Sequence, residues 1–173
     1  MRGEYAGEYA DTVLCFLFDN LIIHTLPSIK GVCFTSAGLN KYVLVEEDKT
    51  WYEAQEYCRS RIGDLATVTN MEDLNLLSNM TAGAESWIGL NDFNRKTMDL
   101  YPNSWRWSNQ TRSRSGYMNF VSDQPDYWLG KEECLCVGLY DGGFSDMECT
   151  TTFPFICSGK LNIHMASFRQ PTF

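Results

Sequence analysis

The tripeptide Gln124-Pro125-Asp126 holds oxygen-bearing side chains on both sides of a rigid proline, and Trp128 follows closely. Further acidic residues lie downstream at Glu132, Glu133 and Asp146. Calcium in proteins takes about six to eight oxygen ligands from carboxylates, amide carbonyls and water. The set therefore predicts a calcium site. By composition alone, however, proline and aspartate are commoner in plain turns, so this interpretation needs support from the rest of the chain.

Two helices are predicted upstream of this tripeptide. Thr50 and Glu53 have the spacing of a capping box, in which each side chain accepts a hydrogen bond from the other residue's backbone N–H. Asn70 offers a second N-cap, before a buried stripe that contains Leu74 and Leu77. Helical spacing also predicts an inward face on the first helix, made of Trp51, Ala54, Cys58 and Ile62.

Short apolar runs predict the strands. Residues 42–45 are rich in strand formers, and we expect the charged run 46–49 to end that strand. Residues 64–68 predict a short connecting strand, and 87–90 a fully buried one. Residues 91–127 carry scattered turn formers with no sustained period, which predicts a long irregular region. Compact domains avoid loops of this length unless they are functional.

The bulk properties limit the classes of function. A chain of 173 residues is enough for one domain with a real core. The formal net charge of −8 disfavours diffuse attraction to nucleic acid or anionic lipid, whereas an acidic surface can gather cations.

Seven cysteines indicate an oxidising compartment, where disulfides persist. Two sequons, at Asn79 and Asn109, indicate glycosylation on a secretory route. A zinc site is disfavoured because neither histidine lies near the cysteines and no C-x-x-C pair occurs.

Catalysis is hard to build from this sequence. His24 and His164 both lie outside the predicted domain, so the commonest general base at neutral pH is missing from it. Asp126 with Glu133 or Asp146 could be drawn as the carboxylate pair of a glycosidase, but the same residues suit a calcium site. We therefore expect that the protein is not an enzyme.

The cysteine spacing, with Trp87-Ile88-Gly89-Leu90, resembles the C-type lectin-like domain from about Lys41 to Cys157. Trp105-Arg106-Trp107 matches that family's alternating tryptophan strand, whose rings anchor the long loop. The resemblance implies an α+β fold of two helices with small antiparallel sheets and a long irregular loop, stapled by disulfides. It implies the pairs Cys58–Cys157 and Cys136–Cys149.

In that family, a Gln-Pro-Asp triplet with a cis peptide before the proline is the galactose-type sugar site. The resemblance implies that calcium is held there by Gln124, Asp126, Glu133 and Asp146. Two sugar hydroxyls would displace water from the ion and hydrogen-bond to its ligands. Trp128 stands where galactose-binding members pack a tryptophan on the apolar face of the sugar.

The sequence departs from the family pattern at two points. The family's Trp-Asn-Asp triplet appears here as Phe144-Ser145-Asp146, so the Ser145 hydroxyl replaces an amide ligand. We keep Ser145 among the residues of the predicted sugar site. The family's glutamate lies two residues before the loop cysteine. Counting back from Cys136 reaches Cys134, a soft sulfur ligand that suits calcium badly, and counting back from Cys134 reaches Glu132.

We favour Cys136 as the loop cysteine because Cys136-Val137-Gly138-Leu139 resembles the family strand, and Glu133 then serves with a one-residue shift. Three cysteines stay unassigned: Cys15, Cys33 and Cys134. Cys33 could pair with Cys134, or a bond could form between two chains.

These patterns predict three segments. Residues 1–32 form a leader or a degenerate signal, whose apolar stretch is too short to span a bilayer. Residues 33–158 form the C-type lectin-like domain, and 159–173 form a loose tail. The expected function is calcium-dependent recognition of galactose-type glycans or glycoproteins by an extracellular or secreted lectin. A calcium-independent module that binds a protein ligand is the alternative, and a disulfide-linked or non-covalent oligomer is compatible with either.

Overall fold

The computed structural model describes residues 14–17, 29–34, 40–92, 105–109, 117–137 and 143–159, with side chains described from residue 42 onward. Two α-helices and one 3-10 turn lie among them: α1 (Trp51–Arg61), α2 (Met71–Thr81) and η2 (Trp128–Gly130). Nine strands complete the described part: β1 (Leu14–Leu17), β2 (Ile29–Phe34), β3 (Asn40–Lys49), β4 (Gly63–Leu65), β5 (Ser86–Asn91), β6 (Arg106–Trp107), β7 (Glu132–Val137), β8 (Phe144–Glu148) and β9 (Phe153–Gly159).

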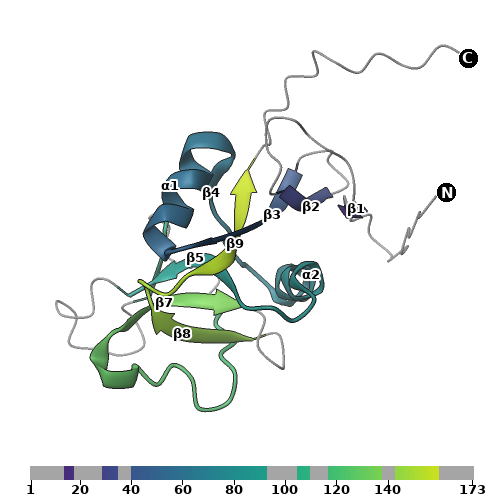
Figure 1. Cartoon of the computed structure of the whole chain (residues 1–173). Helices are drawn as coiled ribbons and strands as arrows, with labels where there is room; N and C mark the ends of the chain where they lie inside the picture. The colour runs from purple at the N-terminus through teal and green to yellow at the C-terminus, as the bar shows by residue number, and fades with distance from the viewer. Residues whose placement is uncertain are drawn as a thin grey trace, which may run out of the picture.

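The strands form a single sheet in the order β1-β2-β3-β9-β5-β7-β8, with β4 paired to β9 and β6 paired to β5. The pairs are antiparallel except β5 with β9, where Trp87 lies opposite Phe155 in a parallel pair. Figure 1 shows α1 and α2 beside the sheet, and β7 and β8 on its side away from α1. The predicted α+β fold is confirmed, with one continuous sheet in place of several small ones.

Both helices begin at the predicted caps. At α1, the Thr50 backbone N–H donates to the Glu53 carboxylate at 2.9 Å, and the Glu53 N–H donates to the Thr50 hydroxyl at 3.4 Å. At α2, the Asp73 N–H donates to the Asn70 side-chain oxygen at 2.8 Å. Each cap satisfies backbone donors that have no partner inside the helix, so the sequence alone was enough to locate these two starts.

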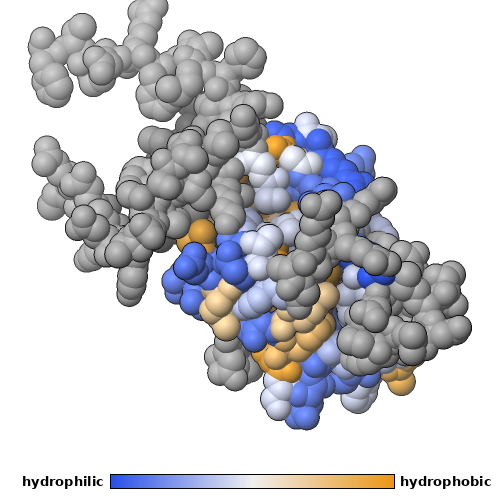
Figure 2. All heavy atoms as spheres, turned by 180° about the vertical axis from the view of Figure 1, so that it is seen from behind, coloured by the Kyte–Doolittle hydropathy of each residue, from blue (hydrophilic) through white to orange (hydrophobic). Residues whose placement is uncertain are grey.

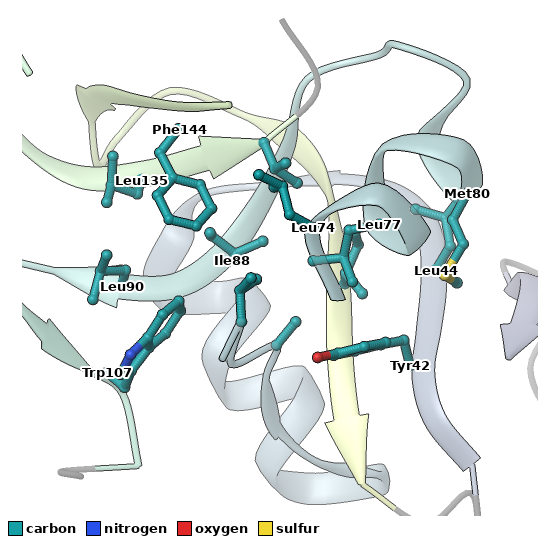
Figure 3. Close-up of a cluster of buried hydrophobic side chains, with 14 of the residues drawn as sticks. Tyr42, Leu44, Leu74, Leu77, Met80, Ile88, Leu90, Trp107, Leu135 and Phe144 are labelled. Atoms are coloured by element: carbon teal, nitrogen blue, oxygen red, sulfur yellow. The ribbon is translucent and has the colours of Figure 1, made fainter. Parts of the chain in front are cut away.

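The sheet is buried on both faces. Side chains alternate between the faces of a strand, so Val43 and Val45 of β3 pack with α1, whereas Tyr42 and Leu44 pack with α2. The close-up in Figure 3 shows the second of these clusters, with α2 and β3 at one end and Leu90, Leu135 and Phe144 at the other. The predicted buried strand 87–90 lies at the centre, within β5, and every residue of β5 is buried.

Three predicted boundaries differ from the structure. The charged run 46–49 does not end the first strand, because Glu46 and Asp48 lie exposed while the backbone of β3 continues to Lys49. The connecting strand predicted at 64–68 is the shorter β4. Segment 1–32, expected to lie outside the domain, contributes β1, which pairs with β2, and the start of β2, which pairs with β3. The expected tail begins at the last residue of β9, and residues 160–173 lie outside the described part.

The disulfide prediction is half right. Cys58 of α1 is bonded to Cys157 of β9, as expected. The predicted Cys136–Cys149 bond is wrong, because Cys149 is bonded to Cys134 and Cys136 is a buried free thiol.

The register of β7 against β8 gives the reason for this difference. Cys134 lies opposite Met147, two residues from Cys149, whereas Cys136 lies opposite Ser145. Four residues of strand span about 13 Å. That separation is well beyond the Cα–Cα distance of about 7 Å that a disulfide can bridge, whereas the Cα atoms of Cys134 and Cys149 are 5.2 Å apart.

The backbone of residues 119–121 covers the outer side of β8. Phe120 forms an isolated parallel bridge with Phe144, whose N–H donates to the Asn119 carbonyl at 2.7 Å. The Val121 N–H donates back to the Phe144 carbonyl at 3.0 Å. Gly143 permits this approach, because a Cβ there would meet the Val121 side chain at 2.8 Å and the Asn119 carbonyl at 2.9 Å.

We predict that removing the Cys134–Cys149 bond by a double change to alanine lowers the free energy of unfolding by about 3 kcal/mol, since it releases a loop of 15 residues. Urea denaturation of the oxidised protein measures this. The matched control is Cys136→Ala, which removes only one buried sulfur and should cost about 1 kcal/mol. A larger loss for Cys136→Ala than for the double variant would contradict the assignment.

Candidate functional site

The loop between β6 and β7 carries the predicted tripeptide in an unusual backbone conformation. The Gln124–Pro125 peptide is cis, as the family resemblance implied. Three non-glycine residues nearby have a positive φ: Asp123 at 65°, Tyr127 at 50° and Leu129 at 53°. L-residues adopt this region rarely, so the surroundings must hold the loop in this shape.

Three carboxylates converge beneath this loop. Asp126 from the loop, Glu132 from the start of β7 and Asp146 from β8 each place a carboxylate oxygen within 4.8 Å of the others. Asp126 is exposed, Glu132 half-buried and Asp146 buried, so the cluster runs from the surface into the sheet. We call these three residues the acidic cluster. Carboxylate oxygens at this spacing are the ligands that a hard cation such as calcium prefers.

Two backbone N–H groups of the loop donate to Asp146, one to each of its carboxylate oxygens. Its two carboxylate oxygens accept from the N–H of Asp126 at 3.1 Å and of Tyr127 at 2.9 Å. The Asp146 N–H in turn donates to the Gln124 side-chain oxygen at 3.3 Å. These hydrogen bonds bring Asp126 and Gln124 to Asp146, which lies 20 and 22 residues further along the chain.

Trp128 links the other two acids through its backbone and leaves its ring in solvent. Its N–H donates to Asp126 at 3.1 Å and to Glu132 at 2.8 Å. The side chain is 65% exposed, although large aromatic side chains normally bury most of their area. An apolar ring therefore lies open beside the acidic cluster.

Two carboxylates of the acidic cluster have raised pKa values, mainly because they are buried. Burial raises the pKa of Glu132 to about 7; the Trp128 N–H opposes this, while a hydrogen bond to Asp126 and the charge of Asp146 add to it. Burial also raises the pKa of Asp146, against the lowering effect of the Tyr127 and Asp126 N–H groups. A cation placed among these oxygens would remove the repulsion and favour the charged forms.

Glu133, one of the predicted ligands, lies outside the acidic cluster, and Glu132 occupies the cluster in its place. The Glu133 carbonyl accepts from the Asp92 N–H at 2.8 Å, and its carboxylate helps to raise the pKa of Tyr52 on α1. The one-residue shift assumed from Cys136 is therefore not needed, because Glu132 lies two residues before the bonded Cys134.

The other predicted positions fall at different depths. Ser145 lies beside Asp146 in β8 and is 2% exposed. Asn79, near the end of α2, and Asn109, after β6, are both exposed, as glycan acceptors must be. The tryptophans of the predicted anchor strand are buried, with Trp105 packed on Tyr127 at 5.8 Å between ring centroids.

Fold and disulfides together define an α+β domain whose helix α1 is bonded to β9 and whose β7 is bonded to the end of β8. Residues 47–159, which make up more than half of the chain, match the family model of the lectin C-type domain. The chain therefore belongs to the C-type lectin domain family.

Several curated proteins are similar to this chain. C-type lectin domain family 10 member A from Mus musculus is 36% identical over 125 residues, which are 69% of this chain and 38% of that protein. Asialoglycoprotein receptor 1 from Mus musculus is 29% identical over 119 residues, 66% of this chain and 39% of that protein. The matched region thus spans about two fifths of the length of these relatives.

Solved structures share the fold. The C-type lectin CEL-I from Cucumaria echinata gives a TM-score of 0.57 at 21% identity, over 69% of this chain and 89% of that one. The herring type II antifreeze protein gives 0.55 at 26% identity, over 70% of this chain and 93% of that one. A lectin and an antifreeze protein on one fold show that the site, and not the fold, must carry any functional argument.

Hydrophilic residues prevail on one face of the described part. Figure 2 shows the side opposite to the view of Figure 1, where the coloured residues are mostly hydrophilic and the apolar ones form small groups. Neither α1 nor α2, the helices of the described part, is long and apolar enough to cross a membrane.

We predict that the metal-free domain loses stability as pH rises from about 4.5 to about 7 through Glu132. Its folded pKa lies above the value of the unfolded chain, so the folded state binds the extra proton and the stabilising contribution is present only at low pH. Urea denaturation in chelator at about pH 5 and about pH 8 measures the difference. Glu132→Gln should reduce this difference, whereas Glu133→Gln should leave it as in the wild type. Equal pH dependence in the wild type and Glu132→Gln would contradict this protonation.

Proposed function

We propose that this domain recognises carbohydrate through a calcium ion, with a preference for galactose-type glycans. The observation that carries the proposal is the acidic cluster of Asp126, Glu132 and Asp146, joined to Gln124 and flanked by the open ring of Trp128. Polar groups that fix hydroxyls and an apolar ring that packs on C–H groups are the two parts that a sugar site needs.

The donor set suits calcium. Gln124 and Asp126 supply oxygens from the loop, and Glu132 and Asp146 from the paired strands β7 and β8. All four are hard oxygen donors, and a cation would favour the charged form of Glu132, whose pKa is raised by burial and, to a smaller extent, by the charges of Asp146 and Asp126. Calcium, when bound, would supply two coordination positions for neighbouring sugar hydroxyls. Ser145 has a shorter side chain than the amide of the family pattern, so we expect weakened and not absent binding.

The orientation of the loop supports the sugar preference. Asp126 and Trp128 are both exposed, whereas Tyr127 between them is half-buried. The backbone N–H of Trp128 donates to the carboxylate of Asp126. This hydrogen bond keeps the indole ring of Trp128 close to the acidic cluster. Gln124 and Asp126, in place of the mannose-type Glu and Asn, favour galactose and its N-acetylated form.

A protein-binding module that works without calcium is the competing function. The observation in its favour is Ser145, which is buried in β8 where the family pattern has an amide ligand. The loop N–H groups bind Asp146 and Glu132, and these hydrogen bonds do not involve an ion. The two functions differ in whether calcium changes the stability of the domain.

We further propose an extracellular or secreted setting with glycoprotein partners. The Cys58–Cys157 and Cys134–Cys149 bonds and the exposed Asn79 support this setting. The name of the asialoglycoprotein receptors supports a glycoprotein as the partner. The trimeric structure of the Kupffer cell C-type lectin receptor, 28% identical with a TM-score of 0.53, supports an oligomer.

Calcium should raise the melting temperature of the domain. An ion that binds only the folded state stabilises it by about 2.7 kcal/mol at one hundred times its Kd. Thermal unfolding in about 10 mM calcium and in chelator measures the shift. Glu132→Gln should abolish it, Glu133→Gln should retain it, and Ser145→Asn should enlarge it. No shift in the wild type would refute the calcium site and leave the protein-binding module.

Galactose or N-acetylgalactosamine should compete for the site better than mannose. Trp128→Ala should weaken galactose binding by about tenfold and leave the calcium-induced melting shift intact, because the ring is exposed and is no calcium ligand. A competition assay on immobilised glycans measures this. Tyr52→Ala, which truncates an exposed aromatic on α1, is the control and should bind as the wild type does. Mannose ahead of galactose, or equal binding after chelation, would refute the mechanism.

A further inference from the structure

Tyr127 stands between Asp126 and Trp128 and makes contacts in three directions. Its backbone N–H donates to the Asp146 carboxylate at 2.9 Å, and its hydroxyl donates to the Asp92 carboxylate at 3.0 Å. Its ring lies on that of Trp105, with 5.8 Å between centroids and an angle of 31° between the planes. One residue of the loop is thus joined to the acidic cluster, to the end of β5 and to the buried core.

Asp92, which accepts the hydrogen bond of the Tyr127 hydroxyl, is itself held in place by the sheet. It follows the last residue of β5, is 1% exposed, and donates its backbone N–H to the Glu133 carbonyl of β7 at 2.8 Å. Its Oδ1 atom is buried and has no hydrogen-bond partner in the described structure, so the Tyr127 hydroxyl is the side-chain donor that this carboxylate has there. A hydrogen bond to a buried charged group is stronger than one between neutral groups, and its loss leaves the charge without compensation.

The backbone of Tyr127 requires such an attachment. Its φ of 50° and ψ of 46° lie in the left-handed region, which a bulky L-residue occupies only when its surroundings impose it. Tyr127 is half-buried while Asp126 and Trp128 are exposed, and the backbone N–H groups of all three residues bind carboxylates of the acidic cluster. The contacts that fix Tyr127 therefore fix the direction of both neighbours.

We propose that Tyr127 is the positioning residue of the site: through its hydrogen bond to Asp92 it holds Asp126 and Trp128 ready for ion and sugar. This inference rests on the proposed function for its ligand, whereas the contacts of Tyr127 with Asp92, Asp146 and Trp105 do not involve that ligand. Preorganisation of this kind raises affinity because the loop need not be ordered when the ligand binds. Asp92 lies 35 residues away in the chain and has no contact with the ligand in this role.

Two measurements on Tyr127→Phe test the proposal, since this variant keeps the ring on Trp105 and removes only the hydroxyl. Hydrogen exchange of the metal-free protein should show faster exchange of the N–H groups of residues 126–128. Calorimetric titration should show a calcium Kd raised by about tenfold. The matched control is Tyr117→Phe, which removes a hydroxyl that donates to Met71 on α2 and should change neither quantity.

Variants of Asp92 separate positioning from a general loss of structure. Asp92→Asn keeps an oxygen that can accept from the hydroxyl and should retain most of the loop protection and affinity. Asp92→Leu should behave as Tyr127→Phe does, and the double variant with Tyr127→Phe should lose no more calcium affinity than the weaker single variant, because both remove the same interaction.

The outcomes distinguish this inference from the proposed function. If the wild type does not bind calcium, the proposed function fails, and hydrogen exchange alone decides the role of Tyr127. Unchanged exchange at residues 126–128 in Tyr127→Phe overturns the positioning role whatever calcium does. Wild-type calcium affinity in Tyr127→Phe also overturns it.

Discussion

The pairing of β7 with β8 is the constraint on which the site depends. It places Leu135 opposite Asp146 and Glu132 near the end of the same ladder, so two acids from separate strands reach one point. A slip of one residue would turn Asp146 to the other face of the sheet and separate the acidic cluster. The bond from Cys134 to Cys149 closes the end of this pair and keeps the register that the site needs.

Concentrated negative charge and its compensation explain the shape of the loop. Three carboxylates within 4.8 Å of one another repel, and the protein offsets this with three successive N–H donors from residues 126–128, while burial raises the pKa of Glu132 to about 7 and so favours its protonated form. A bound cation would take over the compensation that the proton provides. These N–H donors hold the acids at the spacing that a cation would require, which is why the position of Tyr127 matters for binding.

Local patterns made the framework predictable from the sequence, and contacts between distant residues did not. The caps at Thr50 and Asn70 depend on residues three positions apart, so both helix starts were predicted correctly. Cys134 and Cys136 share one face of β7 and are both buried, so burial and alternation could not choose between them. The register of β7 against β8 shifts between Glu132 and Cys134. This shift, which local patterns do not predict, places Cys134 near Cys149 and Glu132 at the acidic cluster. The Tyr127–Asp92 contact had no sequence signal.

The strip of backbone at residues 119–121 also covers part of an exposed strand edge of the sheet. β8 ends the path of paired strands, and an open strand edge is a template for aggregation. The bridge from Phe120 to Phe144, made possible by Gly143, closes part of that edge with the chain that leads into the binding loop. Changes in loop length are therefore better tolerated after this strip than within it, because a shift of Phe120 would expose β8 to other molecules.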